Sequence, residues 1–396
     1  MTGTLGMTRH TLFVVGVLAA LGATAVAQSA APAPTAYAIP PSLGDGWTTG
    51  APEQVGIDRR RLEQMTDAIR SHPQDNVHAV LIEKDGRLVY EEYFSGKDER
   101  RGRPLGVVTF TRDTLHDLRS VTKSVMSALV GIASASGAIP SLDGPLLDYF
   151  PEYTDLQVPE RRAITIRHAL SMSTGFEWNE DLPYTDPKND EIVMDGSPDP
   201  VRYVLGRPIV AAPGATWRYS GGTTEVLGAI LRRATKQSLA DYARTVLFSP
   251  LGISAFEWIG SRDVPSAASG LRLRPRDLAK FGSLYLHDGQ WNGRQVVPRA
   301  WVHESTQRRL TFPGQEARGY GYQWWHTCYS TPSGLVEVPT AVGNGMQRIF
   351  VLRAQRTVVT IVSGRYNDRS INPPERLLLD FIVPALPQAP ASPCPS

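Results

Sequence analysis

Two residues one helical turn apart carry side chains suited to nucleophilic chemistry, Ser120 and Lys123. If a helix begins near Ser120, Lys123 lies three positions further along and one turn up the same face, within reach of the serine hydroxyl. A hydroxyl beside an amine can act as a nucleophile with its base. The residues that follow, up to Gly137, are almost all apolar or small, which predicts a buried helix.

This placement has two chemical consequences. At a helix N-terminus, the backbone N–H of Ser120 and the positive end of the helix can stabilise an oxyanion. Desolvation should lower the pKa of Lys123, so that some neutral amine is available as a base. The structural alternative is that Ser120 only caps the helix while Lys123 extends to solvent.

The composition indicates a globular protein that acts on a small molecule. The 396 residues are 41% hydrophobic, enough for a large core in one domain or two closely joined ones. A formal net charge of +2 provides no basic field for nucleic acid. No cofactor and no metal site are predicted, because the two cysteines, Cys328 and Cys394, are too few and too isolated to bind zinc.

The N-terminal segment resembles an export signal. Residues 1–27 contain an apolar stretch that ends in Ala25-Val26-Ala27, which predicts a cleaved secretory signal, with an uncleaved membrane anchor as the alternative. Residues 28–49 are predicted to form an Ala/Pro-rich spacer. In an oxidising compartment Cys328 and Cys394 could form a disulfide, and two unpaired thiols are the alternative.

The elements around this segment predict an α/β (α+β) fold. The hairpin signal at Asp85-Gly86 lies between two strands near the N-terminus, strands return after Gly334, and the middle of the chain is mostly helical. We therefore expect one antiparallel sheet built from both chain ends and covered by helices, with a helical domain inserted and the active site at the seam. The stretch from Asp181 to Pro200 is expected to be an irregular loop. The expected helices are 57–71, 120–137, 164–170, 223–235, 238–248, 274–287 and one from Pro374; the expected strands are 78–84, 87–93, 335–339, 347–353 and 356–363.

The segment Leu118–Val125 resembles the active-site segment (SxxK motif) of the β-lactamase and penicillin-binding-protein superfamily, and it is most similar to the class C-like serine hydrolases. The resemblance covers residues 50–385 and implies a β-lactamase/transpeptidase-like fold. Its α/β part would span 50–115 and 320–385 and its helical part 116–319, followed by a Pro-rich tail, 386–396. Further blocks that carry the resemblance are 137–143, 149–153, 164–178, 213–220 and 320–325.

The second motif of that family, Tyr-x-Asn, corresponds to Tyr219-Ser220-Gly221. The resemblance implies that Tyr219 exchanges a proton with Ser120 or with the leaving group, helped by Lys123. Gly221 stands where the family has an asparagine that contacts the substrate amide, so recognition of penicillin-type substrates is in doubt. The alternative for Tyr219 is a buried aromatic residue whose hydroxyl bonds to the backbone.

The third motif, Lys-Thr-Gly or His-x-Gly on a strand, best matches Ala341-Val342-Gly343. The resemblance implies that the Asn344 N–H joins that of Ser120 in the oxyanion hole. Gly343 and Gly345 would let the substrate approach the strand backbone, and the alternative is a tight turn. Because the cation of this motif is missing at Ala341, we expect substrates that lack the carboxylate it would hold.

Other residues are weaker candidates for substrate contact. His116 could line the site or form structural hydrogen bonds. The aromatic group Tyr320, Tyr322, Trp324, Trp325 and His326 could form a substrate wall, with Trp324 as the candidate contact, or belong to the core.

The function implied is that of an exported, periplasmic or secreted serine hydrolase that cleaves an ester or amide through an acyl-enzyme on Ser120. Within the family, a carboxylesterase or amide hydrolase of the type that includes nylon-oligomer hydrolases is favoured. A true β-lactamase or D-Ala-D-Ala carboxypeptidase is the first alternative. An inactive cell-wall or ligand-binding protein with the same fold is the second.

Overall fold

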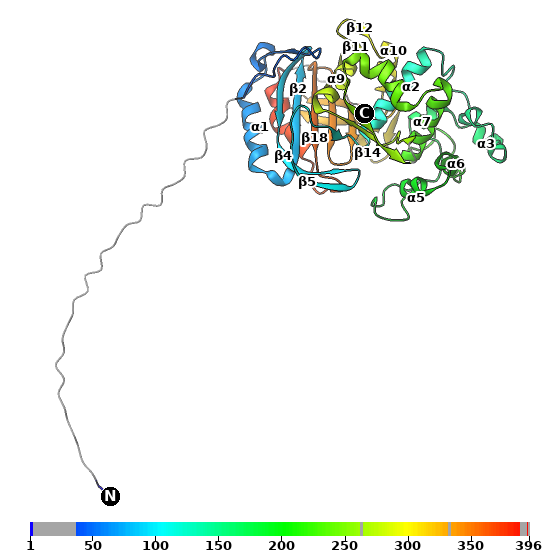
Figure 1. Ribbon diagram of the computed structural model, residues 1–396, viewed down its shortest axis with the longest axis horizontal. Helices are drawn as coiled ribbons and strands as arrows, with labels where there is room; N and C mark the ends of the chain where they lie inside the picture. Colours follow the sequence, from blue (N-terminus) through cyan, green and yellow to red (C-terminus); the bar gives the residue numbers. More distant parts are fainter. Residues whose placement is uncertain (3–36, 262–263, 332–333, 389–393, 395–396) are drawn as a thin grey trace. The chain divides into compact units, whose positions relative to one another are not determined.

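A nine-stranded sheet built from both ends of the chain organises the protein, as predicted (Figure 1). Its strand order is β1-β3-β2-β18-β17-β16-β15-β14-β13, and all neighbours are antiparallel except the parallel pair β1 and β3. The computed structural model describes residues 1–2, 37–261, 264–331, 334–388 and 394. The strands are β1 Thr48–Thr49, β2 Val77–Lys84, β3 Arg87–Tyr93, β13 Leu310–Phe312, β14 Gln315–Tyr320, β15 Trp325–Thr331, β16 Gly334–Gly343, β17 Gln347–Leu352 and β18 Thr357–Ser363.

The hairpin predicted at Asp85-Gly86 is β2–β3, and the pairing of β18 with β2 joins the two chain ends. Strands β2, β17 and β18 are buried along their whole length, which explains their nearly continuous apolar sequences. Strands β13, β14 and β15, at the β13 end of the sheet, were not predicted. Their sequences mix Arg, Gly and aromatic residues, so the period-2 pattern of a strand is weak there.

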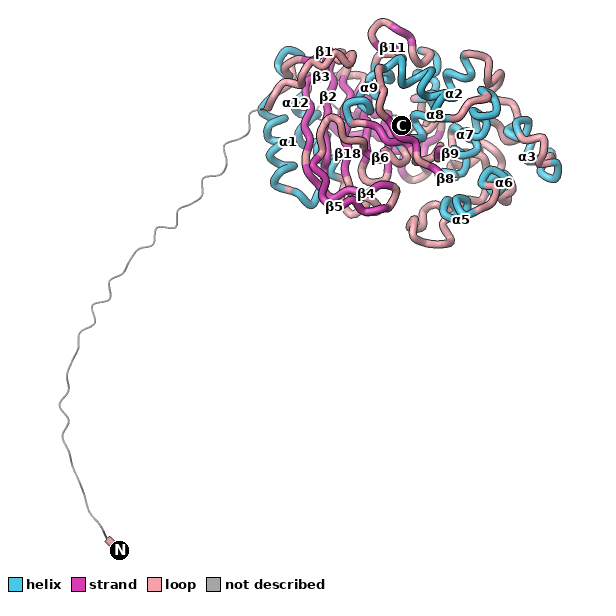
Figure 2. Tube along the Cα trace, viewed as in Figure 1, coloured by secondary structure: helices cyan, strands magenta, loops and turns pink. Residues whose placement is uncertain are grey.

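The outer face of the sheet is covered by helices from both termini (Figure 2). Helix α1, Arg59–Ser71, begins at Asp58, whose carboxylate caps the Arg60 N–H. It packs on a C-terminal group made of α11 Pro373–Leu377, a π-helical turn Leu378–Ile382 and α12 Val383–Ala385. Leu62, Met65, Leu377 and Ile382 belong to one buried apolar cluster, and burial of each such side chain stabilises the fold by about 1.5–3 kcal/mol.

The inner face carries the larger core, between the sheet and the helical region. Helix α9, Pro275–Leu286, lies directly on the sheet: a Cβ at Gly282 would stand 2.7 Å from both Ile349 and Val358. Helix α2, Val121–Ala135, is buried along almost its entire length, as its apolar sequence predicts. The nucleophile segment therefore begins where the sheet meets the helices.

The remaining elements form the helical region and its short β-connections. The expected loop 181–200 is wrong in part, because Asn189 caps a short helix inside it and Asp199 caps the next. The helices are α3 Pro159–Arg162, α4 Ile166–Leu170, α5 Asp190–Gly196, α6 Pro200–Leu205, α7 Gly221–Thr235, α8 Leu239–Ala243 (continued by a π-helical turn Arg244–Phe248) and α10 Arg299–Ser305; the short strands are β4 Ser95–Arg100, β5 Arg103–Thr109, β6 His116–Asp117, β7 Phe256–Trp258, β8 Gly260–Ser261, β9 Val264–Pro265, β10 Leu271–Leu273, β11 Gln290–Trp291 and β12 Arg294–Gln295.

The fold starts earlier in the chain than the sequence suggested. The predicted signal 1–27 and the first part of the spacer lie outside the described residues, apart from the first two. However, Tyr37 stacks on Tyr90 at 4.9 Å and donates to the Val89 carbonyl, and Trp47 is buried. The expected spacer boundary at residue 49 is therefore wrong, because these aromatic residues are part of the core.

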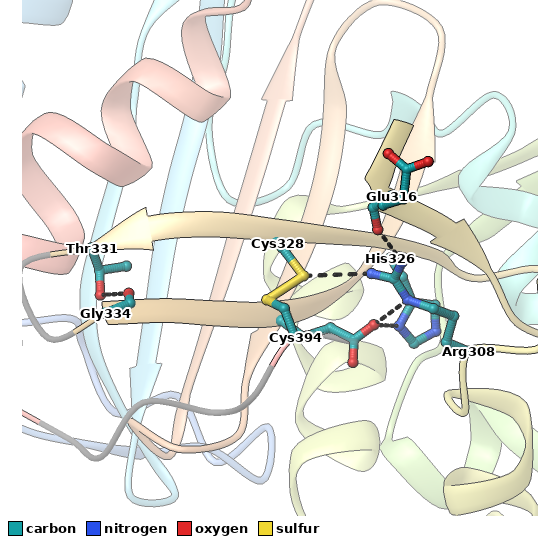
Figure 3. Close-up of a disulfide and its surroundings, with 8 residues drawn as sticks. Arg308, Glu316, His326, Cys328, Thr331, Gly334 and Cys394 are labelled. Carbon is teal, nitrogen blue, oxygen red and sulfur yellow. Dashed lines mark hydrogen bonds and ion pairs between the residues drawn. A yellow bond between two sulfur atoms is a disulfide. The ribbon is translucent and has the colours of Figure 1, made fainter. Parts of the chain in front are cut away.

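Cys328 on β15 forms a disulfide with Cys394, so the alternative of two unpaired thiols is excluded (Figure 3). The Cα atoms are 6.1 Å apart, and Arg308 donates to the Cys328 sulfur. The bond ties the Pro-rich tail to the sheet across a separation of 66 residues. Closing such a loop is worth about 4 kcal/mol. Among the described residues, no helix is long and apolar enough to cross a membrane.

Candidate active site

The turn before α2 fixes the position of Ser120. Arg119 has φ +49°, a left-handed conformation that is uncommon for a residue with a side chain. Its guanidinium forms ion pairs with Glu99 and, at 3.5 Å, with Asp117. Asp117 also pairs with Arg272 at 2.6 Å. These buried contacts hold the strained turn, so Ser120 enters the helix in one defined orientation.

The Ser120 hydroxyl lies 3.1 Å from Lys123 Nζ, within hydrogen-bond distance. Although Ser120 occupies the N-cap position, its hydroxyl caps no backbone N–H in the described chain. Lys123 is only 1% exposed and also donates to the Ala268 carbonyl at 3.1 Å. The alternative of a capping serine and a solvated lysine is therefore excluded.

Tyr219 completes a group of three polar side chains. It precedes α7, whose N-cap Ser220 fixes the turn through its bond to the Thr223 N–H. The Lys123 ammonium lies 4.9 Å from the centre of the Tyr219 ring. Burial raises the pKa of Tyr219, while the Lys123 charge and hydrogen bonds with Ser120 and Lys123 oppose that rise. The geometry thus joins nucleophile, amine and phenol.

The expectation that Lys123 has a lowered pKa is wrong. Burial does disfavour its charge, but Tyr219 and the carboxylates of Glu180 and Glu191 outweigh burial and raise the pKa of Lys123. Lys123 is therefore an ammonium at neutral pH. It can stabilise negative charge on its neighbours, and it is a poor acceptor for the Ser120 proton in the resting state.

Glu180 and Glu191 lie where the family asparagine would project. A Cβ on Gly221 would stand 3.0 Å from Glu191 Oε2 and 3.2 Å from Glu180 Oε2. Glu180 accepts from the Gly221 N–H at 2.6 Å, from Trp178 Nε1 at 2.9 Å and from the Tyr184 hydroxyl at 3.0 Å. The missing side chain at position 221 thus makes room for two acidic groups.

Burial and the charge of Glu191 raise the pKa of Glu180 to about 8. Its folded pKa lies above the usual value of 4.5, so the folded state holds this proton more tightly than the unfolded state does. The resulting stability is fully present below pH 4.5 and is lost as pH rises through about 8.

We expect Glu180→Gln to reduce this pH dependence. Because glutamine does not ionise, the free energy of unfolding of the variant should fall less than that of the wild type between about pH 4.5 and 8, as measured by urea unfolding. Glu177→Gln is the matched control, since Glu177 pairs with Arg207 at the surface. An unchanged wild-type slope in Glu180→Gln would contradict the assignment.

A cavity of about 330 Å³ opens above Ser120. Its walls combine the two motif regions with the loop before α5 and with an aromatic face, in which Trp325 lies 5.5 Å from Trp217 and 5.6 Å from Tyr219 between ring centres. The lining residues are Ser120, Glu180, Asp181, Tyr184, Trp217, Tyr219, Arg318, Trp325, Thr327, Tyr329, Thr340, Val342, Gly343, Asn344, Gly345, Met346, Arg348, Asp368, Arg369, Asn372 and Glu375.

The end of β16 forms one wall of the cavity. Gly343, Asn344 and Gly345 all line the cavity. A Cβ at Gly343 would stand 2.3 Å from the Leu118 carbonyl, so this glycine lets the strand approach the nucleophile segment itself. The Asn344 side chain is held by Asn367, to which it donates at 2.7 Å. Asn344 and Ser120 thus line the same cavity.

The cation of the third motif is missing at Ala341, but the cavity contains other cations. Arg318, Arg348 and Arg369 line it from positions outside the third motif. Acidic residues, including Asp181 and Asp368, line it as well. The absence of lysine or histidine at position 341 therefore says nothing about a substrate carboxylate.

Three of the expected substrate contacts are placed elsewhere. His116 and Trp324 are fully buried, and Gly221 packs against Glu180 and Glu191. None of the three is among the described residues that line the cavity. Trp324 packs on Tyr285 in the core, whereas its neighbour Trp325 faces the site, because successive residues of a strand point to opposite sides. Tyr320, Tyr322 and His326 are also buried.

Glu180 and Glu191 were missed in the sequence. They lie in a stretch rich in Asp, Pro and Gly, where acidic residues are expected to be solvated. No local signal marks their burial. The glycine in place of the family asparagine was the only hint that another group could occupy that position.

The Beta-lactamase family model matches residues 71–380, so the chain belongs to the beta-lactamase family. It is 29% identical over 215 residues to Esterase EstB of Burkholderia gladioli, a match that covers 51% of this chain and 53% of that one. It is 25% identical over 269 residues to the 6-aminohexanoate-dimer hydrolase of Paenarthrobacter ureafaciens, covering 63% and 64%. The chain thus spans between about half and two thirds of these relatives.

The fold is also that of EstCE1, a hydrolase with promiscuous acyltransferase activity. The TM-score is 0.64 at 17% identity, and the superposition covers 81% of this chain and 96% of that structure.

Proposed function

We propose that this protein is a serine hydrolase that cleaves an ester or amide through an acyl-enzyme on Ser120. The observation that carries the proposal is the contact of Ser120 with Lys123 and Tyr219 at the base of a cavity. The oxyanion hole would be formed by the backbone N–H groups of Ser120 and Asn344.

The protonation states of Lys123 and Tyr219 determine how protons move during the reaction. As the Ser120 oxygen attacks the substrate carbonyl, the neutral phenol of Tyr219 gives its own proton to the leaving alcohol or amine and takes the Ser120 proton in its place, so Tyr219 is protonated before and after the relay. The Lys123 ammonium stabilises the negative charge that develops on the phenol oxygen. A water molecule then attacks the acyl carbon and returns a proton through Tyr219 to Ser120.

A carboxylesterase or amide hydrolase is favoured over a true β-lactamase or a D-Ala-D-Ala carboxypeptidase. Support comes from the named activities of the esterase and the 6-aminohexanoate-dimer hydrolase, and from the aromatic wall of Trp217 and Trp325. Glu180 and Glu191 fill the position from which the family asparagine would contact a β-lactam amide. An acidic pair there changes both the charge and the hydrogen bonding offered to that amide.

Two assays test this reading. The protein should react with a fluorophosphonate at a single serine and turn over a short p-nitrophenyl ester. Folded protein that is neither labelled by the fluorophosphonate nor active on the ester would favour the alternative of an inactive cell-wall or ligand-binding protein. Nitrocefin should be cleaved much more slowly than the ester, and comparable rates would reverse the ranking against β-lactamase.

We also propose that the protein is exported to the periplasm or beyond the cell. The support is the Cys328–Cys394 disulfide, since such bonds persist in oxidising compartments. The mass of the protein recovered from a host periplasm should correspond to cleavage after Ala27. Uncleaved protein held in the cytoplasm would contradict export.

A further inference from the structure

Behind the nucleophile segment, three buried donor side chains face one another: His78 on β2, Asp98 on β4 and His116 on β6. One ligand atom from each lies within 4.8 Å of the other two. His78 and His116 are fully buried and Asp98 is 6% exposed. None of the three is among the described residues of the cavity lining. The proposed hydrolytic reaction therefore does not use this cluster.

The outer nitrogens of both imidazoles are committed to donating. His116 Nδ1 lies 2.9 Å from the Asp117 carbonyl, which can only accept. His78 Nε2 lies 3.2 Å from Asn76 Oδ1. The orientation of the Asn76 amide is fixed, because its Oδ1 accepts from the Lys97 N–H and its Nδ2 donates to the Lys97 carbonyl. Both inner nitrogens, His78 Nδ1 and His116 Nε2, therefore carry lone pairs in the neutral rings.

These two lone pairs point at each other across 2.9 Å. Two facing acceptors need a cation between or beside them. The nearest acidic oxygen, Asp98 Oδ1, lies 3.9 Å from His116 Nε2.

The separations match a small metal ion. Zinc binds histidine nitrogens and carboxylate oxygens at about 2.0–2.2 Å, which places tetrahedral donors about 3.3 Å apart. The separations of His116 Nε2 from His78 Nδ1, 2.9 Å, and from Asp98 Oδ1, 3.9 Å, lie on either side of that value. Shifts of a few tenths of an ångström would make them equal.

Hydrogen bonds from neighbouring residues orient all three donor side chains, as they do around bound metal ions. Metal-binding histidines usually donate their other N–H to a carbonyl or amide oxygen, as both do here. The Asp98 carboxylate is oriented by the Tyr366 hydroxyl, which donates to Oδ1 at 3.0 Å. Two glycines pack directly against the His78 ring, because a Cβ at Gly96 would stand 2.6 Å from it and a Cβ at Gly364 would stand 2.5 Å from it.

We propose that His78 Nδ1, His116 Nε2 and Asp98 Oδ1 bind one divalent transition-metal ion, with zinc as the ion that fits this donor set. Burial away from the cavity makes the site structural. It joins β2, β4 and β6 directly ahead of Asp117 and Arg119, which hold the turn into Ser120. The ion thus fixes the segment that positions the nucleophile.

The test uses the full chain, prepared without a histidine tag, stripped with a chelator and titrated with ZnCl₂. We expect one zinc per chain by mass spectrometry of metals and a higher melting temperature with zinc, because an ion that binds only the folded state stabilises it. Co²⁺ in its place should give the visible absorption of a tetrahedral site. Stripping that leaves the melting temperature unchanged, with no zinc uptake afterwards, would overturn the proposal in favour of a shared proton.

Variants separate this site from adventitious binding. Asp98→Asn keeps the size of the side chain and should weaken zinc binding by about 10- to 100-fold or more, since even outer-shell changes cost that much. His72→Gln is the matched control, because His72 is exposed and bonds only to its own helix end. Wild-type zinc affinity in Asp98→Asn would contradict the site. If that variant does not fold, the Co²⁺ spectrum and stoichiometry of the wild type decide.

Discussion

Ser120→Ala is expected to abolish fluorophosphonate labelling and to lower ester hydrolysis by about 10⁴-fold or more, because the acyl-enzyme can no longer form. The rest of the site should stay in place, since the Ser120 hydroxyl caps no backbone N–H in the described chain. The melting temperature should therefore change little. Labelling followed by mass spectrometry, with steady-state rates on a p-nitrophenyl ester, measures both effects.

Ser124→Ala is the matched control for that experiment. Ser124 lies one turn further along α2, but its hydroxyl is buried and donates to the Gln323 carbonyl at 2.7 Å. It should keep the covalent label and most of the activity at temperatures where it is folded. Full labelling of Ser120→Ala would show that another serine is the nucleophile.

The main frame of the fold was predictable because its signals are local. The hairpin at Asp85-Gly86, the apolar period of α1 and the buried helix α2 each follow from residues close together in the chain. The joining of both termini in one sheet followed from the strand signals at the two ends. The contact of Ser120 with Lys123 was predictable for the same reason, since one helical turn separates them.

The electrostatics of the site could not be predicted, because they depend on distant residues. Lys123 was expected to lose its proton through burial alone, yet Glu180 and Glu191 reach it from a separate loop and reverse the sign of the shift. The cation of the third motif is missing at Ala341, and the arginines that line the cavity come from other elements. The spacing of apolar residues predicts which way a side chain points within one helix or strand. It does not predict which residues of other elements lie beside that side chain.

The candidate metal cluster shows the same limit. The two cysteines of the sequence are too few and too isolated to bind zinc, and they gave no sign of a metal site. The donors His78, Asp98 and His116 come from three separate strands. Only the packing of the β4–β5 hairpin beside β2 and β6 brings them together. The disulfide is a similar case, because its two possible states could be separated only once the tail was placed beside β15.

Lys123→Met is expected to lower activity by about 10²- to 10⁴-fold and to destabilise the fold by about 3–5 kcal/mol. The loss of stability arises because the Glu191 carboxylate would lose the cation that faces it in the interior, whereas Glu180, with a pKa of about 8, holds its proton at neutral pH. Since the pKa of Lys123 is raised, its charge is present at every pH up to its alkaline range, and the deficit should appear throughout the neutral range. Urea unfolding and ester hydrolysis measure the two effects separately.

The double variant Lys123→Met/Glu191→Gln distinguishes structure from catalysis. Removing one carboxylate along with the ammonium should restore a large part of the stability, because less uncompensated charge stays buried. Activity should remain low, since the phenol oxygen of Tyr219 would still lack the cation that stabilises its negative charge. If activity returned together with stability, Lys123 would only balance buried charge, and Tyr219 would not need its ammonium for proton transfer.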